Sequence, residues 1–218
     1  MLVSTDWATI ASFATAFGTL VLAIATFASI RSANRAARIA EAAFEANLRP
    51  VLVSSRLDDP VQKIRWMDNH WAVLKGAQGI VQLDDGNIYL SISVRNAGSG
   101  LAVAQGWAIM PHVADADAPH LEPDQFRRQT RDLYVAPNDI GFWQAALRDP
   151  MDPDYAALRK DIEEVEPFTV ELLYGDHEGG QRTITRFGMI PYQTDETVVW
   201  FPSVALHWNL DRPDPRAR

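Results

Sequence analysis

The 218-residue chain suits one domain of ordinary size together with a membrane anchor and a linker, because two full domains would each have a small core. It contains no cysteine, which excludes disulfides, thiolate metal sites and cysteine nucleophiles. Residues 1–50 hold four Lys plus Arg and three Asp plus Glu, which leaves 16 basic and 25 acidic residues and a formal charge near −9 in the rest. Such an acidic domain disfavours nucleic-acid binding and peripheral docking on an anionic leaflet.

The stretch from Ala8 to Ile30 carries no charge and lies between Asp6 and Arg31. As a helix it would cover roughly 34 Å, against a hydrocarbon core of about 30 Å, so it predicts one transmembrane helix. The expected anchor residues are Trp7, Phe13, Phe17, Gly18, Leu22 and Phe27. A cleaved signal peptide and a buried core helix are the alternatives, although a signal peptide would begin with basic residues.

Three arginines follow the apolar stretch, at Arg31, Arg35 and Arg38. The positive-inside rule then predicts a single-pass protein of the inner (cytoplasmic) membrane, with the N-terminus outside and the C-terminal domain in the cytoplasm. No helix breaker occurs between Gly18 and Pro50, so the helix is expected to continue as a stalk over residues 31–49. Small residues at four-residue spacing, such as Ala14 with Gly18, favour a homo-oligomer, but the abundance of alanine explains them equally well. Whether the stalk forms a coiled coil or packs on the soluble domain stays open.

From residue 51 onward the apolar period changes from helical to two, most clearly where Ile88, Leu90, Ile92 and Val94 alternate with polar residues. Further strands are expected over residues 71–74, 101–109, 133–136, 140–147, 168–174, 182–190, 198–201 and 204–208. One helix begins at a cap formed by Asp152 and Pro153, and residues 122–131 are a weaker second candidate. The fold class is thus mainly β: an antiparallel β-sandwich over residues 50–210 with one or two short helices, after the anchor (1–30) and stalk (31–49) and before a disordered tail (211–218).

Two turns stand out between good strand candidates. Asn96, Gly98 and Gly100 form the first, where glycine permits the positive φ that a tight crossing requires, and Tyr174–Gln181 forms the second, a hairpin. Together with Arg49-Pro50, the segment 95–102 (RNAGSGLA), the segment 135–139 (VAPND) and the Tyr174-x-Asp176-x-x-Gly179 pattern, the chain resembles a loose group of bacterial single-span membrane proteins with an immunoglobulin-like domain. The resemblance implies a fold and a location, and it carries no catalytic residues.

The candidate site residues are few. The five histidines form no pair at metal-ligand spacing, although His112 and His120 flank two aspartates, and no phosphate-binding loop or nucleophile elbow is present, so we expect no cofactor. Asp176, His177 and Glu178 at the second turn are candidate interaction residues. Trp200 and Phe201 are candidates for an exposed apolar patch, because adjacent strand residues point to opposite faces. Arg127, Arg128 and Arg131 form a short basic run among acidic neighbours.

These features predict a non-enzymatic, membrane-anchored interaction or scaffold module that binds a protein partner which the sequence does not identify. A membrane effector or sensor, whose domain binds a ligand or partner and controls assembly of the spanning helices, is the first alternative. A hydrolase with a dispersed acidic site is the second, and it requires two carboxylates and a histidine that converge in one cleft.

Overall fold

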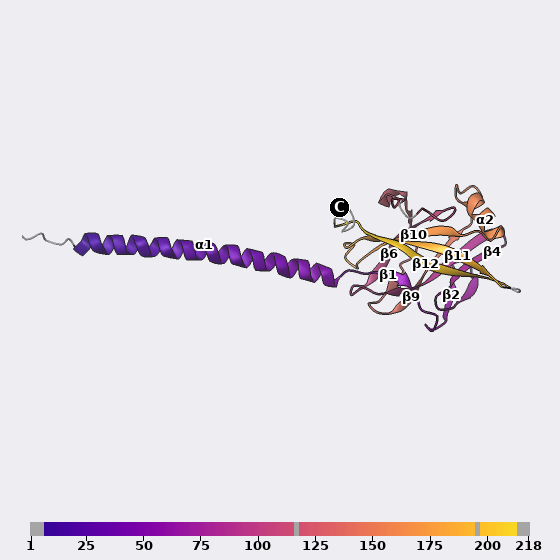
Figure 1. Ribbon diagram of the computed structural model, residues 1–218, viewed down its shortest axis with the longest axis horizontal. Helices are drawn as coiled ribbons and strands as arrows, with labels where there is room; N and C mark the ends of the chain where they lie inside the picture. Colours follow the sequence, from indigo (N-terminus) through magenta and orange to yellow (C-terminus); the bar gives the residue numbers. More distant parts are fainter. Residues whose placement is uncertain (1–6, 116–117, 195–196, 213–218) are drawn as a thin grey trace, which may run out of the picture. The chain divides into compact units, whose positions relative to one another are not determined.

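A computed structural model describes residues 7–115, 118–194 and 197–212. The chain divides into two compact units, the first ending at Ala46 and the second beginning at Asn47. The described residues of the first unit belong to a single helix, α1 (Trp7–Asn47), which ends at the first residue of the second unit (Figure 1). Its large apolar side chains are exposed, and Phe13, Phe17 and Phe27 are each more than two-thirds exposed. This helix is long and apolar enough to span a membrane, in agreement with the sequence.

The second unit is built mainly from antiparallel strands. They are β1 (Leu52–Ser54), β2 (Gln62–Arg65), β3 (Trp71–Leu74), β4 (Gly79–Asp84), β5 (Asn87–Asn96), β6 (Ala102–Met110), β7 (Arg127–Arg128), β8 (Tyr134–Val135), β9 (Ile140–Leu147), β10 (Phe168–Gly175), β11 (Thr183–Gln193) and β12 (Val198–Asn209). A 3₁₀ turn, η1 (Pro123–Gln125), and one further helix, α2 (Tyr155–Glu163), interrupt them. The mainly β class is therefore confirmed.

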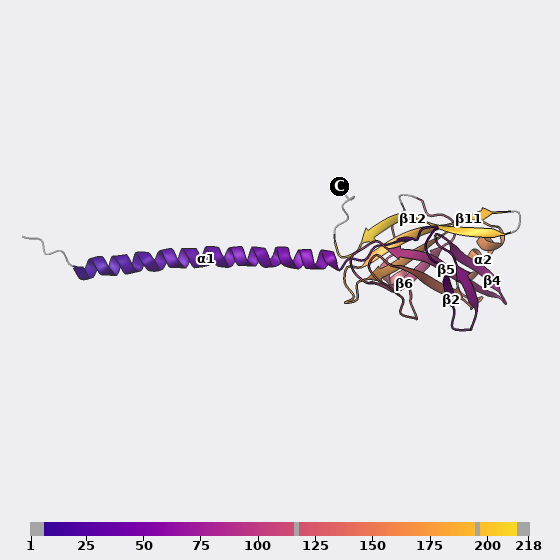
Figure 2. The same cartoon turned by 90° about the horizontal axis from the view of Figure 1, so that it is seen from below.

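Ten of these strands form one sheet, and β2 pairs with β3 in a separate hairpin. The sheet runs in the order β1-β5-β4-β12-β11-β10-β6-β7, with β9 paired to β5 and β8 to β6. Figure 2 shows β11 and β12 running together as a long hairpin. Between β12 and β4 the ladder consists of the single pair Trp200 and Gly79.

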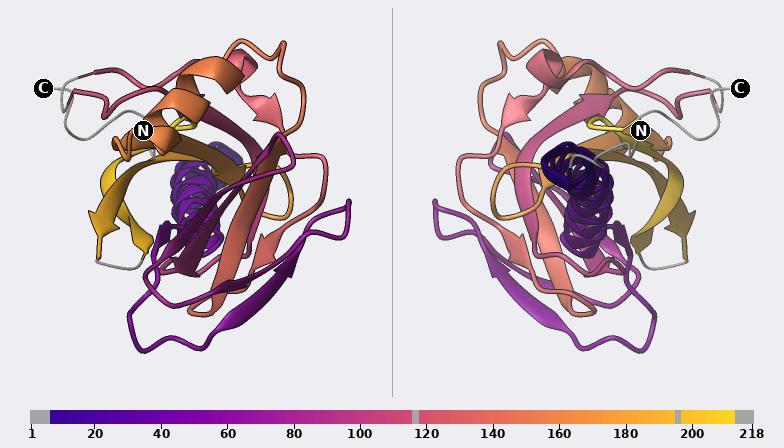
Figure 3. Two further views of the ribbon diagram at one scale, coloured as in Figure 1. Left: turned by 90° about the vertical axis from the view of Figure 1, so that its right-hand side faces the viewer. Right: turned by 90° about the vertical axis from the view of Figure 1, so that its left-hand side faces the viewer.

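The sheet curls, so that strands far apart in its order surround one core (Figure 3). Trp107 of β6 and Trp143 of β9 meet edge to face with ring centroids 5.7 Å apart. The Asn138 backbone N–H donates to the Asn96 carbonyl at 2.9 Å, which joins the loop before β9 to the end of β5. The core consists of buried aliphatic and aromatic side chains from both ends of the sheet order, such as Ile92 and Leu172.

Several expected elements have different limits. The predicted strands 198–201 and 204–208 are one strand, β12, which a bulge opposite Arg186 and Phe187 interrupts without ending it. The candidate helix over 122–131 is only the turn η1 followed by β7. The cap of α2 was predicted at Asp152 and Pro153, but the residue directly before the helix is Asp154. The Asp152 carboxylate binds the Arg127 guanidinium instead. Residues 213–218 of the expected tail lie outside the described residues.

The first conspicuous turn is held by the side chain of Asn96, which is fully buried. Its Oδ1 accepts the N–H groups of Val51 and Gly98, and its Nδ2 donates to the carbonyls of Gly100 and Val135. The sequence suggested that Gly98 and Gly100 adopt a positive φ, but in the described chain the glycines with positive φ are Gly86 and Gly179. The glycines of this turn are needed for a different reason. A Cβ at Gly100 would lie 1.7 Å from the Leu48 carbonyl oxygen, so glycine permits the close passage of the entering chain.

Candidate interaction surface

The β2–β3 hairpin has one buried face and one exposed face. Ile64, Leu74 and the following Trp66 are buried and pack with Ile80 and Tyr89 in a small second core. The Trp66 indole N–H also donates to the Ala145 carbonyl on β9 at 2.9 Å. These contacts fix the hairpin on the main sheet, so its orientation, and therefore its outer face, is defined.

The outer face consists of two cross-strand pairs, Lys63 with Val73 and Arg65 with Trp71, which we call the hairpin face. All four side chains are exposed, and Trp71 and Val73 are each 59% exposed. The Arg65 guanidinium lies 5.5 Å from the Trp71 ring centroid. Figure 3 shows the hairpin, in purple, at the periphery of the domain. This face places apolar and cationic groups together on a domain that is strongly acidic.

Exposed tryptophan is uncommon in this molecule. Trp66, Trp107, Trp143 and Trp200 are at most 8% exposed, and Trp208 is half-buried. Trp71 is therefore the outward-facing tryptophan of the domain. Val61 and Met67, which flank β2 in the sequence, are also 59% and 81% exposed. Aromatic side chains at such positions supply much of the free energy of protein–protein binding.

The aromatic pair predicted at the end of the chain has a different environment. Trp200 is 4% exposed, and its ring lies 5.3 Å from the Phe168 ring in the core. Phe201 is half-buried. Trp200 is consequently unavailable to a partner.

The sequence did not predict the hairpin face, because its first strand was not recognised. The segment Gln62-Lys-Ile-Arg65 contains a single apolar residue, too few to show the alternation of a strand.

The predicted acidic turn is a local structural device. Asp176 is buried, and its Oδ1 accepts the N–H groups of Glu178 and Gly180 at 2.9 and 2.8 Å. His177 and Glu178 are exposed, with His177 Nε2 3.8 Å from a Glu178 carboxylate oxygen. The turn thus brings the three predicted residues together, but Asp176 is already engaged by the backbone.

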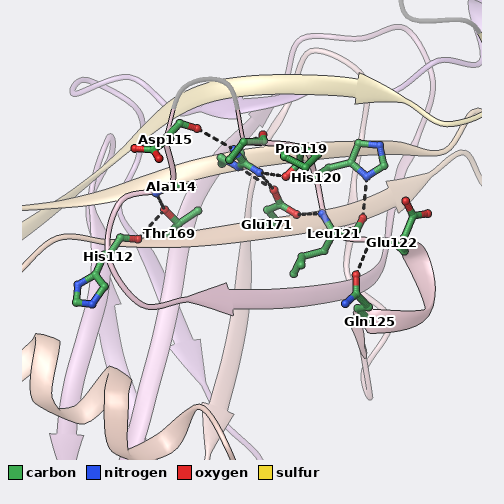
Figure 4. A network of polar contacts seen from close by, with 12 residues as sticks. His112, Ala114, Asp115, Pro119, His120, Leu121, Glu122, Gln125, Thr169 and Glu171 are labelled. Carbon is green, nitrogen blue, oxygen red and sulfur yellow. Dashed lines mark hydrogen bonds and ion pairs between the residues drawn. The ribbon is translucent and has the colours of Figure 1, made fainter.

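A buried ion pair lies farther along β10 and β11, away from the turn that joins them. Glu171 and Arg186 are cross-strand partners on β10 and β11, and they are 0% and 2% exposed. The guanidinium donates to Glu171 at 2.6 and 2.8 Å, and to the carbonyls of Ala118 and Pro119. Glu171 also accepts the Leu121 N–H at 3.1 Å (Figure 4). The pair therefore fastens residues 118–121 over the sheet.

The histidines are dispersed. Figure 4 shows His112 and His120 on opposite sides of this polar network, with His120 Nδ1 2.7 Å from the Leu121 carbonyl. His70 stacks on Tyr89 at 3.9 Å and contacts Asp84. Among the described residues, which omit Asp117, no group of three His, Asp or Glu side chains is arranged to hold a metal ion.

The predicted anchor and topology residues all belong to α1. Trp7, Phe13, Phe17, Gly18, Leu22 and Phe27, and the arginines Arg31, Arg35 and Arg38, are exposed on this helix. The chain matches no protein-family model, no curated protein and no solved structure. Its function must therefore be argued from the contacts and surfaces of the chain itself.

Proposed function

We propose that the chain is a non-enzymatic, membrane-anchored interaction module whose hairpin face binds an acidic protein segment. In this proposal α1 crosses the cytoplasmic membrane once, with the N-terminus outside. The β domain, an immunoglobulin-like sandwich by its resemblance, then lies in the cytoplasm. The observation that carries the proposal is the exposure of Trp71 and Val73 beside Lys63 and Arg65, on a hairpin whose other face is firmly packed.

Charge complementarity favours an acidic protein over the other occupants of this face. The hairpin face has two cations and no carboxylate, so a segment with carboxylates and apolar side chains would match both of its components. An anionic leaflet would gain only about 1 kcal/mol per cation, and its extended negative surface would face the whole domain, whose charge is near −9. A second copy would set one acidic domain against another, whereas a short acidic segment contacts mainly the two cations of the hairpin face.

Site-specific crosslinking in native membranes tests the proposal. The chain has no cysteine, so Val73→Cys introduces a unique thiol at the hairpin face, and Met151→Cys, at a residue 86% exposed elsewhere, is the matched control. We expect Val73→Cys, and not Met151→Cys, to yield one discrete product with a foreign protein, linked through an acidic peptide. A product with a second copy, a product with lipid only, or equal products at both positions would overturn the proposal.

Truncation of the aromatic side chain gives the expected magnitude. Trp71→Ala in the Val73→Cys background should weaken the complex roughly 30-fold, since a central aromatic contributes about 2 kcal/mol. Charge reversal by Arg65→Glu should weaken it as well, whereas Arg159→Glu on α2, an exposed arginine away from the hairpin, should not. The yield of crosslinked product, measured at increasing concentrations of the partner, gives the apparent affinity of each variant. Equal effects of Arg65→Glu and Arg159→Glu would contradict the role of the hairpin face.

The orientation of the chain is a separate prediction. If the β domain is cytoplasmic, a membrane-impermeant maleimide should label Met151→Cys only after the membrane is permeabilised. The physical reason is that three arginines immediately follow the apolar stretch and are retained on the cytoplasmic side. Labelling in intact spheroplasts, at the level seen after permeabilisation, would reverse the proposed orientation.

A further inference from the structure

A pocket of about 180 Å³ lies where β7 and β9 run beside one another without backbone pairing. Its walls come from the residues after β7 and from the second half of β9. Buried Trp66, Trp107 and Gln144 contribute to its floor, whereas the exposed arginines Arg128, Arg131 and Arg148 contribute to its rim. The pocket is therefore apolar and amide-lined inside and cationic at its mouth.

The opening exists because the two strand edges are joined there only by side chains. Gln129 Nε2 donates to the Gln144 carbonyl at 3.4 Å, and Gln144 Nε2 reaches the Arg65 carbonyl at 3.5 Å. Both contacts are long for hydrogen bonds. A continuous β ladder would have filled this space with backbone, so the separation of β7 from β9 leaves the cavity.

Two amide oxygens of the pocket lack a partner within the described part of the chain. They are Gln129 Oε1 and Gln144 Oε1, and Gln144 is only 6% exposed. Turning the Gln144 amide does not remove the problem, because Oε1 would then face the Arg65 carbonyl. Buried acceptors of this kind are almost always satisfied in folded proteins. The pocket thus calls for a molecule that donates hydrogen bonds.

The rim supplies positive charge that the protein itself leaves largely uncompensated. Among the described residues, Arg128 and Arg131 make no ion pair, in contrast to Arg127, which binds Asp152 and Asp154. Arg148 binds Asp68 at 2.8 Å. Burial alone would raise the pKa of Asp68, but hydrogen bonds from Tyr89 and Arg148 outweigh it and lower this pKa to about 2. Asp68 is therefore ionised at pH 7, and its negative charge compensates the positive charge of Arg148. Two guanidinium groups remain for a ligand.

We propose that this pocket binds a small molecule that carries a carboxylate or phosphate group together with an N–H or O–H donor. The oxyanion binds Arg128 and Arg131, whose planar guanidinium groups match such anions in geometry. The donor reaches the free oxygens of Gln144 and Gln129. The volume slightly exceeds the roughly 150 Å³ of a benzene-binding cavity, so the ligand has about six to ten non-hydrogen atoms. This inference is independent of the partner at the hairpin face.

Calorimetric titration of the full chain in neutral detergent micelles tests the proposal with four probes. Phosphoethanolamine and β-alanine contain an oxyanion and a separate ammonium donor, inorganic phosphate contains the anion without a separate donor group, and ethanolamine contains the donor without the oxyanion. We expect at least one of the first two to bind roughly tenfold or more tightly than either single-function probe, because each charged hydrogen bond adds about 1.5–3 kcal/mol. Equal binding of phosphate alone would indicate an adventitious ion only and would overturn the proposal, as would no binding of either double-function probe.

Single substitutions show which pocket residues bind the anion of the ligand and which bind its donor. Arg131→Ala and Arg128→Ala should each weaken phosphoethanolamine roughly tenfold, and Arg159→Ala, an exposed arginine on α2, should leave it unchanged. Gln144→Leu removes the unpartnered oxygen at similar size, so it should weaken phosphoethanolamine but not phosphate. Unchanged binding in all three pocket variants, with each variant folded by circular dichroism, would show that the probe binds elsewhere.

The ligand can come from a lipid headgroup or from a free solute, and the same titration distinguishes them. The full chain is placed in vesicles of phosphatidylcholine, with or without phosphatidylethanolamine. Weaker apparent binding of phosphoethanolamine in the second vesicles identifies a headgroup that already occupies the pocket. Equal binding in both identifies a free solute. Either result requires the Arg131→Ala loss, and without it the pocket assignment fails.

Discussion

Arg186→Ala is expected to lower the free energy of unfolding by about 3–5 kcal/mol, the usual cost of removing one partner from a buried ion pair. Glu171, which is 0% exposed, would keep a charge without its cation or would have to take up a proton. The carbonyls of Ala118 and Pro119 would lose their donors at the same time. Urea denaturation of the full chain in detergent micelles, followed by tryptophan fluorescence, measures the change.

A matched control lies just before the same strand. Arg182 binds Asp211 at 2.6 Å, but both side chains are at least 30% exposed, so Arg182→Ala should cost no more than about 1 kcal/mol. The double change Glu171→Leu with Arg186→Met should restore a large part of the loss, because no lone charge stays buried. Similar losses for Arg186→Ala and Arg182→Ala would contradict the fastening role of the Glu171–Arg186 pair.

Asn96→Ala should destabilise the domain by about 2–6 kcal/mol, since it removes four hydrogen bonds with net contributions of about 0.5–1.5 kcal/mol each. The variant leaves the Val51 and Gly98 N–H groups and the Gly100 and Val135 carbonyls without this partner. No other side chain of the described region holds this turn from inside.

The first residue of the same strand supplies the comparison for Asn96. The Asn87 side chain makes one 3.3 Å contact with the Tyr89 hydroxyl, so Asn87→Ala should cost less than about 1 kcal/mol. The same urea titration measures both variants. Equal midpoints for Asn87→Ala and Asn96→Ala would show that the four contacts of Asn96 contribute little.

Regular patterns made part of this structure predictable. The uncharged stretch that ends at Ile30, and the absence of a breaker before Pro50, predicted one helix, and α1 ends at Asn47. The alternation from Ile88 to Val94 predicted β5. In both cases the information is local, because a helix or a strand with one apolar face leaves its period in consecutive residues.

The rest depends on contacts between segments that lie far apart in the sequence. Thr169 and Glu171 alternate with apolar residues on β10, which predicts a solvent-facing side, yet every residue of this strand is buried. The reason is that Ala114 and residues 118–121 lie on that side and supply partners for Thr169, Glu171 and Arg186. The alternating pattern of β10 gives no sign that another segment lies over its polar side.

The candidate sites have the same dependence on distant partners. The hairpin face arises from the register of β2 and β3, which puts Lys63 opposite Val73 and Arg65 opposite Trp71. The pocket combines Gln144 on β9 with the basic run after β7, which the sequence showed only as surface arginines. Predicting either site requires strand pairing, which neither composition nor spacing supplies.

The single residue pair that joins β12 to β4 has a consequence for motion within the domain. On one side of this junction the ladders of β1, β4, β5 and β9 are continuous, and on the other side those of β12, β11, β10 and β6. Parting the two groups breaks few main-chain bonds, so side-chain contacts are what keep them together, such as the Trp107 ring against Trp143 and the Tyr174 hydroxyl that accepts the Leu52 N–H. Each group would therefore behave as one cooperative foldon, and transient opening would begin between them.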